Sequence, residues 1–225
     1  MNTIISVVIC IIGMLFQTAF MEAERREKLL PALLLKSCAS FIFVIIGINS
    51  FNESSHGTYA RLVLAGLILG AAGDILLNLQ YFAGKYSQAV FLTGVFSFFA
   101  GHVMYLLAIF PLRENHVAAI TAGVLAAILI LTVLFKMLKP DTVYKVFGIL
   151  YIGTVSIMCA VSLQNMITIA SRQSAVFAAG AVLFLISDVV LIFNIFGNRV
   201  SHLRRVINLS CYYIAQLLIA ITIML

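Results

Sequence analysis

Residues 60–80 read ARLVLAGLILGAAGDILLNLQ, an apolar run with a single carboxylate, Asp74, inside it. A membrane-spanning helix needs about 20 mainly apolar residues, because each residue advances about 1.5 Å through a hydrocarbon layer about 30 Å thick. Residues 174–196, SAVFAAGAVLFLISDVVLIFNIF, repeat the pattern around Asp188. Both stretches predict membrane helices that carry a buried acid.

The rest of the chain is apolar to a similar degree. Of its 225 residues, 63% are hydrophobic and 10% are charged, which is more apolar surface than a soluble domain buries around one core. The sequence predicts an all-α integral membrane protein of about eight transmembrane helices, forming one transmembrane domain over residues 1–225. The predicted spans cover residues 3–20, 29–49, 60–80, 89–110, 117–138, 143–163, 174–196 and 206–225.

Basic residues are distributed unevenly over the two ends of these spans. A net charge of +6 would suggest nucleic acid in a soluble protein, but here the positive-inside rule accounts for it, so we expect no nucleic-acid partner. The even-numbered connections and adjoining span ends carry three basic residues, Arg61, Arg113 and Arg172, against ten at the odd-numbered ones. The asymmetry places the odd-numbered connections in the cytoplasm and both termini on the non-cytoplasmic side. The ten are Arg25, Arg26, Lys28, Lys85, Lys136, Lys139, Lys145, Arg199, Arg204 and Arg205.

The two aspartate-bearing segments also resemble each other. Residues 65–77, AGLILGAAGDILL, align without a gap on residues 179–191, AGAVLFLISDVVL. The alignment indicates a parallel internal repeat with halves 1–112 and 113–225, and repeat proteins in membranes often bind substrate where the repeats meet. Chance similarity between apolar helices is the alternative, because the first two predicted helices do not visibly match the fifth and sixth.

The aspartates are the strongest candidates for catalytic groups. An ionisable side chain inside the bilayer costs about 2.5–3.5 kcal/mol on insertion scales, so a carboxylate there needs an explanation. We predict that Asp74 and Asp188 lie inside the bundle and carry the chemistry. The alternative is a structural pair of carboxylates that lock helices together, with Lys36 of the second span as a counter-ion.

Other polar side chains recur at helical spacing within the predicted spans. We predict His102 as a further catalytic group, although a lone buried histidine also occurs as a structural core residue. The predicted substrate-binding residues are Asn78, Tyr105, Tyr212, Gln216 and Lys36, for which hydrogen bonds between helices are the alternative. We expect no metal and no cofactor, because His102 is the one histidine within a predicted span and no cysteine has a C-x-x-C neighbour.

Four blocks of the sequence, in order and spacing, resemble the YhhN family of membrane proteins, whose animal members are lysoplasmalogenases. The resemblance covers most of the chain, and Tyr151 with Met158 fits a looser family pattern. One departure is Lys36-Ser37, where the family tends to have Lys-Pro. The four blocks are Gly73-Asp74-Ile75-Leu76-Leu77, the run Gly94, Phe98, His102 and Tyr105, the segment Ser187-Asp188-Val189-Val190-Leu191, and Tyr212 with Gln216.

The resemblance implies hydrolysis of the vinyl ether bond of a lysoplasmalogen to a fatty aldehyde and a glycerophospho-base. This chemistry needs an acid that is still protonated near neutral pH and a base that guides water. We expect one aspartate to be the acid and the other the anion that stabilises the cationic intermediate, with their order left open. The expected partners are the lysophospholipid substrate and membrane lipids, and the expected location is the bacterial inner membrane, or the endoplasmic reticulum of a eukaryote. The competing classes are a transporter that relays protons through the aspartates, a lipid-handling protein and a scaffolding protein.

Overall fold

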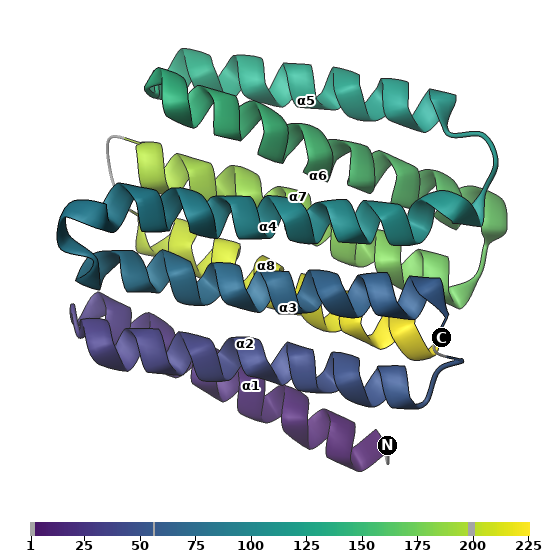
Figure 1. Cartoon of the computed structure of the whole chain (residues 1–225), viewed down its shortest axis with the longest axis horizontal. Helices are drawn as coiled ribbons and strands as arrows, with labels where there is room; N and C mark the ends of the chain where they lie inside the picture. Colours follow the sequence, from purple (N-terminus) through teal and green to yellow (C-terminus); the bar gives the residue numbers. More distant parts are fainter. Residues whose placement is uncertain (1–2, 56, 198–200) are drawn as a thin grey trace.

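A computed structural model shows a bundle of long antiparallel α-helices (Figure 1). It describes residues 3–55, 57–197 and 201–225, with side chains from Val8 onward, and within this part of the chain it contains eight α-helices and no strand. Short 3-10 turns follow α3, α4 and α8. The helices are α1 (Thr3–Arg25), α2 (Leu29–Asn52), α3 (Thr58–Leu79), α4 (Ser87–Ile109), α5 (Val117–Leu138), α6 (Thr142–Ile169), α7 (Arg172–Phe196) and α8 (His202–Ile221).

The prediction of a multi-pass all-α membrane protein is confirmed. The helices α2 to α8 are each long and apolar enough to cross a bilayer. Seven of the eight predicted spans coincide with these helices once the 3-10 turns are included, and the first predicted span, 3–20, lies within α1. The first helix, α1, packs on α2 and α8 through Phe20 and Ala23, which form a small core cluster with Ala32 and Leu209. That α1 also crosses the membrane stays a prediction.

Local sequence signals fix where several helices begin and end. The Ser171 hydroxyl accepts a hydrogen bond from the Ser174 backbone N–H at 3.1 Å, and the Ser174 hydroxyl accepts one from the Ser171 N–H, so a capping box starts α7. The helices α5 and α6 end at Lys139 and Ala170, whose φ angles of 46° and 51° are left-handed and cannot continue a helix. Tight turns of this kind keep neighbouring helices antiparallel.

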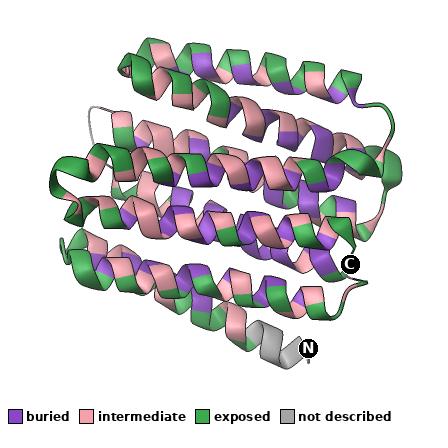
Figure 2. Ribbon diagram, viewed as in Figure 1, coloured by how far each residue is buried: buried purple, intermediate pink, exposed green. Residues whose placement is uncertain are grey.

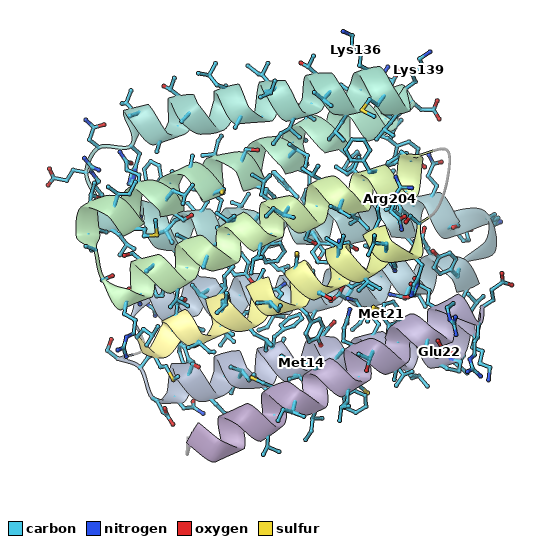
Figure 3. The ribbon with its side chains drawn as sticks, turned by 180° about the vertical axis from the view of Figure 1, so that it is seen from behind. Met14, Met21, Glu22, Lys136, Lys139 and Arg204 are labelled. Atoms are coloured by element: carbon cyan, nitrogen blue, oxygen red, sulfur yellow. The ribbon has the colours of Figure 1, made fainter. Side chains whose placement is uncertain are left out.

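All odd-numbered connections lie at one end of the bundle, and both termini lie at the other (Figure 1). Figure 3 shows Lys136, Lys139 and Arg204 at the end that holds the odd-numbered connections. We call the end that holds the odd-numbered connections the basic end, and that it faces the cytoplasm stays a prediction. Arg199, which contributes to the charge asymmetry, lies outside the described residues.

Buried residues concentrate along the middle of the bundle, whereas α5 is largely exposed at its edge (Figure 2). The helices α3 and α4 pack closely as one hairpin and α7 and α8 as another, while α5 packs mainly on α6. The two aspartates come from α3 and α7, the equivalent helices of these two hairpins. This arrangement is the one an internal repeat would produce, and the repeat itself remains a prediction.

Candidate active site

Asp74 on α3 is held by partners from two other helices. Its Oδ1 lies 3.2 Å from the Lys36 Nζ of α2. Its Oδ2 accepts hydrogen bonds from the Ser40 hydroxyl at 2.5 Å and from the Tyr212 hydroxyl of α8 at 2.7 Å. A carboxylate with a cation on one oxygen and two hydroxyl donors on the other is fully paired, as a buried charge requires. Asp74 therefore has the surroundings of an ionised group.

The Lys36 ammonium is buried together with its partner. The Lys36 and Asp74 side chains are only 4% and 5% exposed. Three aromatic rings surround the ammonium, with centroids at 4.6 Å for Tyr212, 5.4 Å for Phe20 and 5.7 Å for Tyr213. Cation–π contacts of this kind help to replace the water that a buried cation loses. The counter-ion role considered for Lys36 from the sequence matches this geometry.

A chain of hydrogen bonds leads from α4 to Asp74. The Tyr105 hydroxyl donates to Gln216 Oε1 at 2.7 Å, and Gln216 Nε2 donates to the Tyr212 hydroxyl at 3.2 Å. Gly70 on α3 leaves room for this chain, because a Cβ there would lie 2.5 Å from Gln216 Nε2. The chain fixes the direction of the Tyr212 hydroxyl, which donates to Asp74.

Asp188 on α7 has very different surroundings. Its Oδ2 lies 3.8 Å from His102 Nε2 and has no hydrogen-bond partner within the described part of the chain. The Tyr151 hydroxyl of α6 lies 3.2 Å from the same His102 nitrogen and also interacts with the Asp188 carboxyl. No lysine or arginine among the described residues forms an ion pair with Asp188. The side chain is 3% exposed, so it is a buried carboxyl group that no cation fully neutralises.

His102 belongs to the Asp188 cluster. Its ring packs edge-on against Phe184 at a centroid distance of 4.7 Å, and its Nδ1 has no hydrogen-bond partner among the described residues. His102 lies beside Asp188, whereas the partners of Asp74 are Lys36, Ser40 and Tyr212, so the two aspartates have separate sets of partners.

Both aspartates line one cavity of about 650 Å³. A cavity of this size is within the range typical of small-molecule sites. It extends from Asp74 and Asp188 to the basic end of the bundle, where charged side chains form its rim. Other polar side chains on its wall include Lys36, Asn78, Tyr81, Tyr151, Ser187, Asn194, Asn208 and Tyr212, and the rim includes Glu24, Arg25, His202 and Arg205.

The rim contains an ion pair between the first and last helices. The Arg205 Nε of α8 donates to the Glu24 Oε2 of α1 at 2.7 Å, and the two side chains are 24% and 30% exposed. This pair ties α1 to the mouth of the cavity.

The predicted site residues thus form two layers. Asp74, Asp188, Lys36, Asn78 and Tyr212 line the cavity itself. His102, Tyr105 and Gln216 are buried behind its wall. His102 contacts Tyr151 of the wall, Gln216 contacts Tyr212 of the wall, and Tyr105 contacts Gln216. Tyr105 and Gln216 are thus placed to orient Tyr212, and their role in substrate binding stays a prediction.

Sequence reasoning missed Ser40 and gave Tyr151 no role in the site. Ser40, which donates a hydrogen bond to Asp74, follows Lys36 by one helical turn, so the helical spacing contained a signal for it. Tyr151, which lines the cavity, was indicated only by the looser family pattern. The backbone carbonyl and the hydroxyl of Ser187 both accept hydrogen bonds from Asn208 Nδ2, at 3.0 and 2.8 Å. This contact joins α7 to α8 next to Asp188.

These features define a polytopic helical membrane protein with a polar cavity that contains two carboxyl groups. The YhhN family model matches residues 27–223, which include all of α2 to α8, so the protein belongs to the YhhN family. Within the described part of the chain, no three His, Cys, Asp or Glu side chains gather as metal ligands would.

Curated relatives cover most of the chain. The lysoplasmalogenase TMEM86B of Homo sapiens is 29% identical over 87% of this chain and 73% of its own length. The lysoplasmalogenase TMEM86B of Sus scrofa is 26% identical over 84% of this chain and 74% of its own. A lysoplasmalogenase homolog of Dictyostelium discoideum is 25% identical over 78% of this chain and 67% of its own. No solved structure shows significant similarity to the chain.

Proposed function

We propose that the protein is a lysoplasmalogenase, which hydrolyses the vinyl ether bond of a lysoplasmalogen to a fatty aldehyde and a glycerophospho-base. The relatives named lysoplasmalogenase support the reaction class. The observation that carries the proposal is the pair of carboxyl groups in one cavity with opposite surroundings. Asp74 is paired with a lysine, whereas the charged-group neighbour of Asp188 within the described part of the chain is the imidazole of His102.

Hydrolysis of a vinyl ether begins with proton transfer to carbon. A protonated Asp188 donates its proton to the β-carbon, and the electrons of the C=C bond form the new C–H bond. The ether oxygen then shares a lone pair with the α-carbon, which gives an oxocarbenium ion. This ion needs a nearby anion, and the Asp188 carboxylate left by the proton transfer supplies one.

Water completes the reaction. As water attacks the oxocarbenium carbon, the Asp188 carboxylate accepts a proton from it and returns to its acid form. The resulting hemiacetal loses its alcohol, which breaks the C–O bond, frees the glycerophospho-base and leaves the aldehyde. One carboxyl group can therefore serve as acid and then as base in the same turnover.

His102 and Tyr151 are assigned to positioning and proton exchange at Asp188. Their hydrogen bond of 3.2 Å restrains the imidazole beside the carboxyl group, and the unpartnered Oδ2 of Asp188 remains free for the substrate or water. Which ring nitrogen carries the proton depends on this network.

Asp74 is assigned the role of a fixed second anion. Its pairing with Lys36 and two hydroxyls suits a permanently charged group that stabilises the cationic intermediate through the cavity. Lys36, Asn78 and Tyr212 line the same wall and are assigned to binding the glycerophospho part of the substrate. Arg25 and Arg205 at the rim provide positive charge where the phosphate would enter.

Seven apolar helices make the chain an integral multi-pass membrane protein. We place it in the inner membrane of a bacterium, or in the endoplasmic reticulum of a eukaryote, with the basic end in the cytoplasm. A cavity that reaches this end then draws lysolipid from the cytoplasmic leaflet and releases the water-soluble product to the cytoplasm.

The test is turnover by purified protein in detergent, where no ion gradient exists to drive a transporter. A 1-alkenyl lysophosphatidylcholine should release aldehyde, measured by coupled reduction with an alcohol dehydrogenase. The matched 1-alkyl lipid lacks the double bond and should release none. A folded, monodisperse protein that releases no aldehyde would contradict the proposed activity.

A further inference from the structure

A second hollow lies beside the polar cavity, and its wall is almost entirely apolar. It is formed by α4, α5, α6 and α7, with Phe91, Val95, Leu134, Phe135, Gly148 and Ile192 among its lining residues. We call it the side groove. Nothing in the reaction chemistry requires it, so its apolar surface calls for a separate explanation.

The side groove is continuous with the polar cavity. Six residues line both hollows, namely Leu77, Phe91, Phe98, Tyr151, Leu191 and Ile195. Tyr151 is the residue that contacts His102 and Asp188. The groove therefore begins at the position of the proposed chemistry.

An aromatic cluster forms part of the groove wall near the basic end. The Tyr144 ring lies 6.0 Å from the Phe91 ring and 5.2 Å from the Phe196 ring, so α4, α6 and α7 are joined there. Tyr144 and Tyr151 are seven residues apart on α6, which corresponds to about 10 Å of groove.

The side of the groove is open to the surroundings of the bundle. The helices α4 and α5 both pack on α6, and Figure 1 shows α6 between them. Phe91, Leu92 and Phe135 on the groove wall are only half-buried. In a membrane, this opening faces lipid chains.

We propose that the side groove binds the hydrocarbon chain of a single-chain lipid whose polar part occupies the polar cavity, and that the chain enters sideways from the bilayer. This proposal rests on the proposed function, which identifies the substrate bond beside Tyr151 and Asp188 as a vinyl ether. A lysophospholipid has one polar end and one chain, which match one polar and one apolar compartment that meet at the reactive groups. Burial of successive methylene groups in the groove would favour long chains.

Two glycines on α6 allow a matched test. A Cβ at Gly148 would point at the Phe135 ring, 3.7 Å from its nearest carbon, whereas a Cβ at Gly153 would meet nothing within 4 Å. Gly148→Trp and the milder Gly148→Leu should fill the groove, and Gly153→Trp and Gly153→Leu make the same changes outside it. Neither glycine lines the polar cavity.

The first readout is kcat/KM for 1-alkenyl lysophosphatidylcholines with a hexadecenyl or an octenyl chain. Filling the groove should lower the long-chain value by about tenfold or more, the factor expected when two or more methylene groups lose their apolar site. The short-chain value should stay within about twofold, and the Gly153 variants should leave both values unchanged. Equal losses for both chains, or equal effects at Gly148 and Gly153, would overturn the proposal.

The second readout does not depend on activity. A 1-acyl lysophosphatidylcholine with a diazirine near the end of its chain is photolysed with the wild-type protein, and labelled peptides are mapped by mass spectrometry. Labels should fall on the groove-lining parts of α4 to α7, residues 91–98, 131–151 and 191–196, and should decrease in a folded Gly148 variant. Labels confined to segments that do not line the groove would overturn the proposal even if the Gly148 variants fail to fold. A wild-type protein that is labelled in the groove but releases no aldehyde would refute the proposed function and leave the lipid site standing.

Discussion

Replacing each aspartate by asparagine should have opposite effects on stability. The Lys36–Asp74 pair is separated by 3.2 Å, which corresponds to about 5 kcal/mol of attraction at an effective dielectric constant of about 20. Asp74→Asn removes the anion and leaves the ammonium buried, so the expected loss is about 3–5 kcal/mol, typical of a broken buried pair. Asp188→Asn strands no lysine or arginine of the described residues, and an amide costs less to bury than a charge, so stability should hold or rise.

The assay is thermal unfolding of the purified variants in one detergent, with the double variant Lys36→Met/Asp74→Asn as the control. Removing both charges should recover most of the stability lost in Asp74→Asn, because no unpaired ion remains. Difference infrared spectra should show a protonated carboxyl band that disappears in Asp188→Asn. An Asp74→Asn protein as stable as Asp188→Asn, with no recovery in the double variant, would refute the assignment of Asp74 as the ionised partner of Lys36.

Three further predictions concern the groups around the site and the topology. Tyr151→Phe removes a hydroxyl that hydrogen-bonds His102. Because such a bond contributes about 1.5 kcal/mol, kcat should fall by about tenfold while the fold stays intact. An unchanged kcat would exclude a role for the hydroxyl. Gly70→Ala should displace Gln216, because its Nε2 would lie 2.5 Å from the added Cβ. This change should lower activity and cost about 1 kcal/mol of stability, whereas the control Gly153→Ala should do neither. Equal activities in the two variants would contradict this prediction. A reporter fused after Leu225 should be active in its non-cytoplasmic form, and activity of the cytoplasmic form would reverse the topology.

Much of the fold follows from the sequence, because a run of about 20 apolar residues has few alternatives to a membrane helix. The helix ends do not follow as well. Apolar residues mark the part of a helix that meets lipid, whereas caps mark where the helix stops. Thus α1 continues to Arg25 instead of residue 20, and α6 continues to Ile169 instead of residue 163. At the other end, Ser201 caps α8 five residues before the predicted span begins at residue 206.

The candidate site, like the fold, could be predicted from the sequence only in part. Helical spacing identified side chains that share a face, such as Asp74 with Asn78, both of which line the cavity. It did not indicate which helices would meet. The partnership of His102 with Asp188, and the place of Tyr151 between the cavity and the groove, depend on how α4, α6 and α7 pack. Packing of this kind is decided by side-chain shape, which spacing along one helix does not record.

The central claim is that the protein protonates the β-carbon of a vinyl ether and that Asp188 delivers the proton. The most direct measurement is hydrolysis of a 1-alkenyl lysophosphatidylcholine in D₂O by the wild-type protein and by Asp188→Asn. The aldehyde is trapped as its oxime, and the deuterium content of the oxime is determined by mass spectrometry. The wild-type protein should release aldehyde with one deuterium on the carbon next to the carbonyl, and Asp188→Asn should do so at least about a hundredfold more slowly, as expected for loss of general acid catalysis. Aldehyde without deuterium, or wild-type rates from a folded Asp188→Asn protein, would contradict the account.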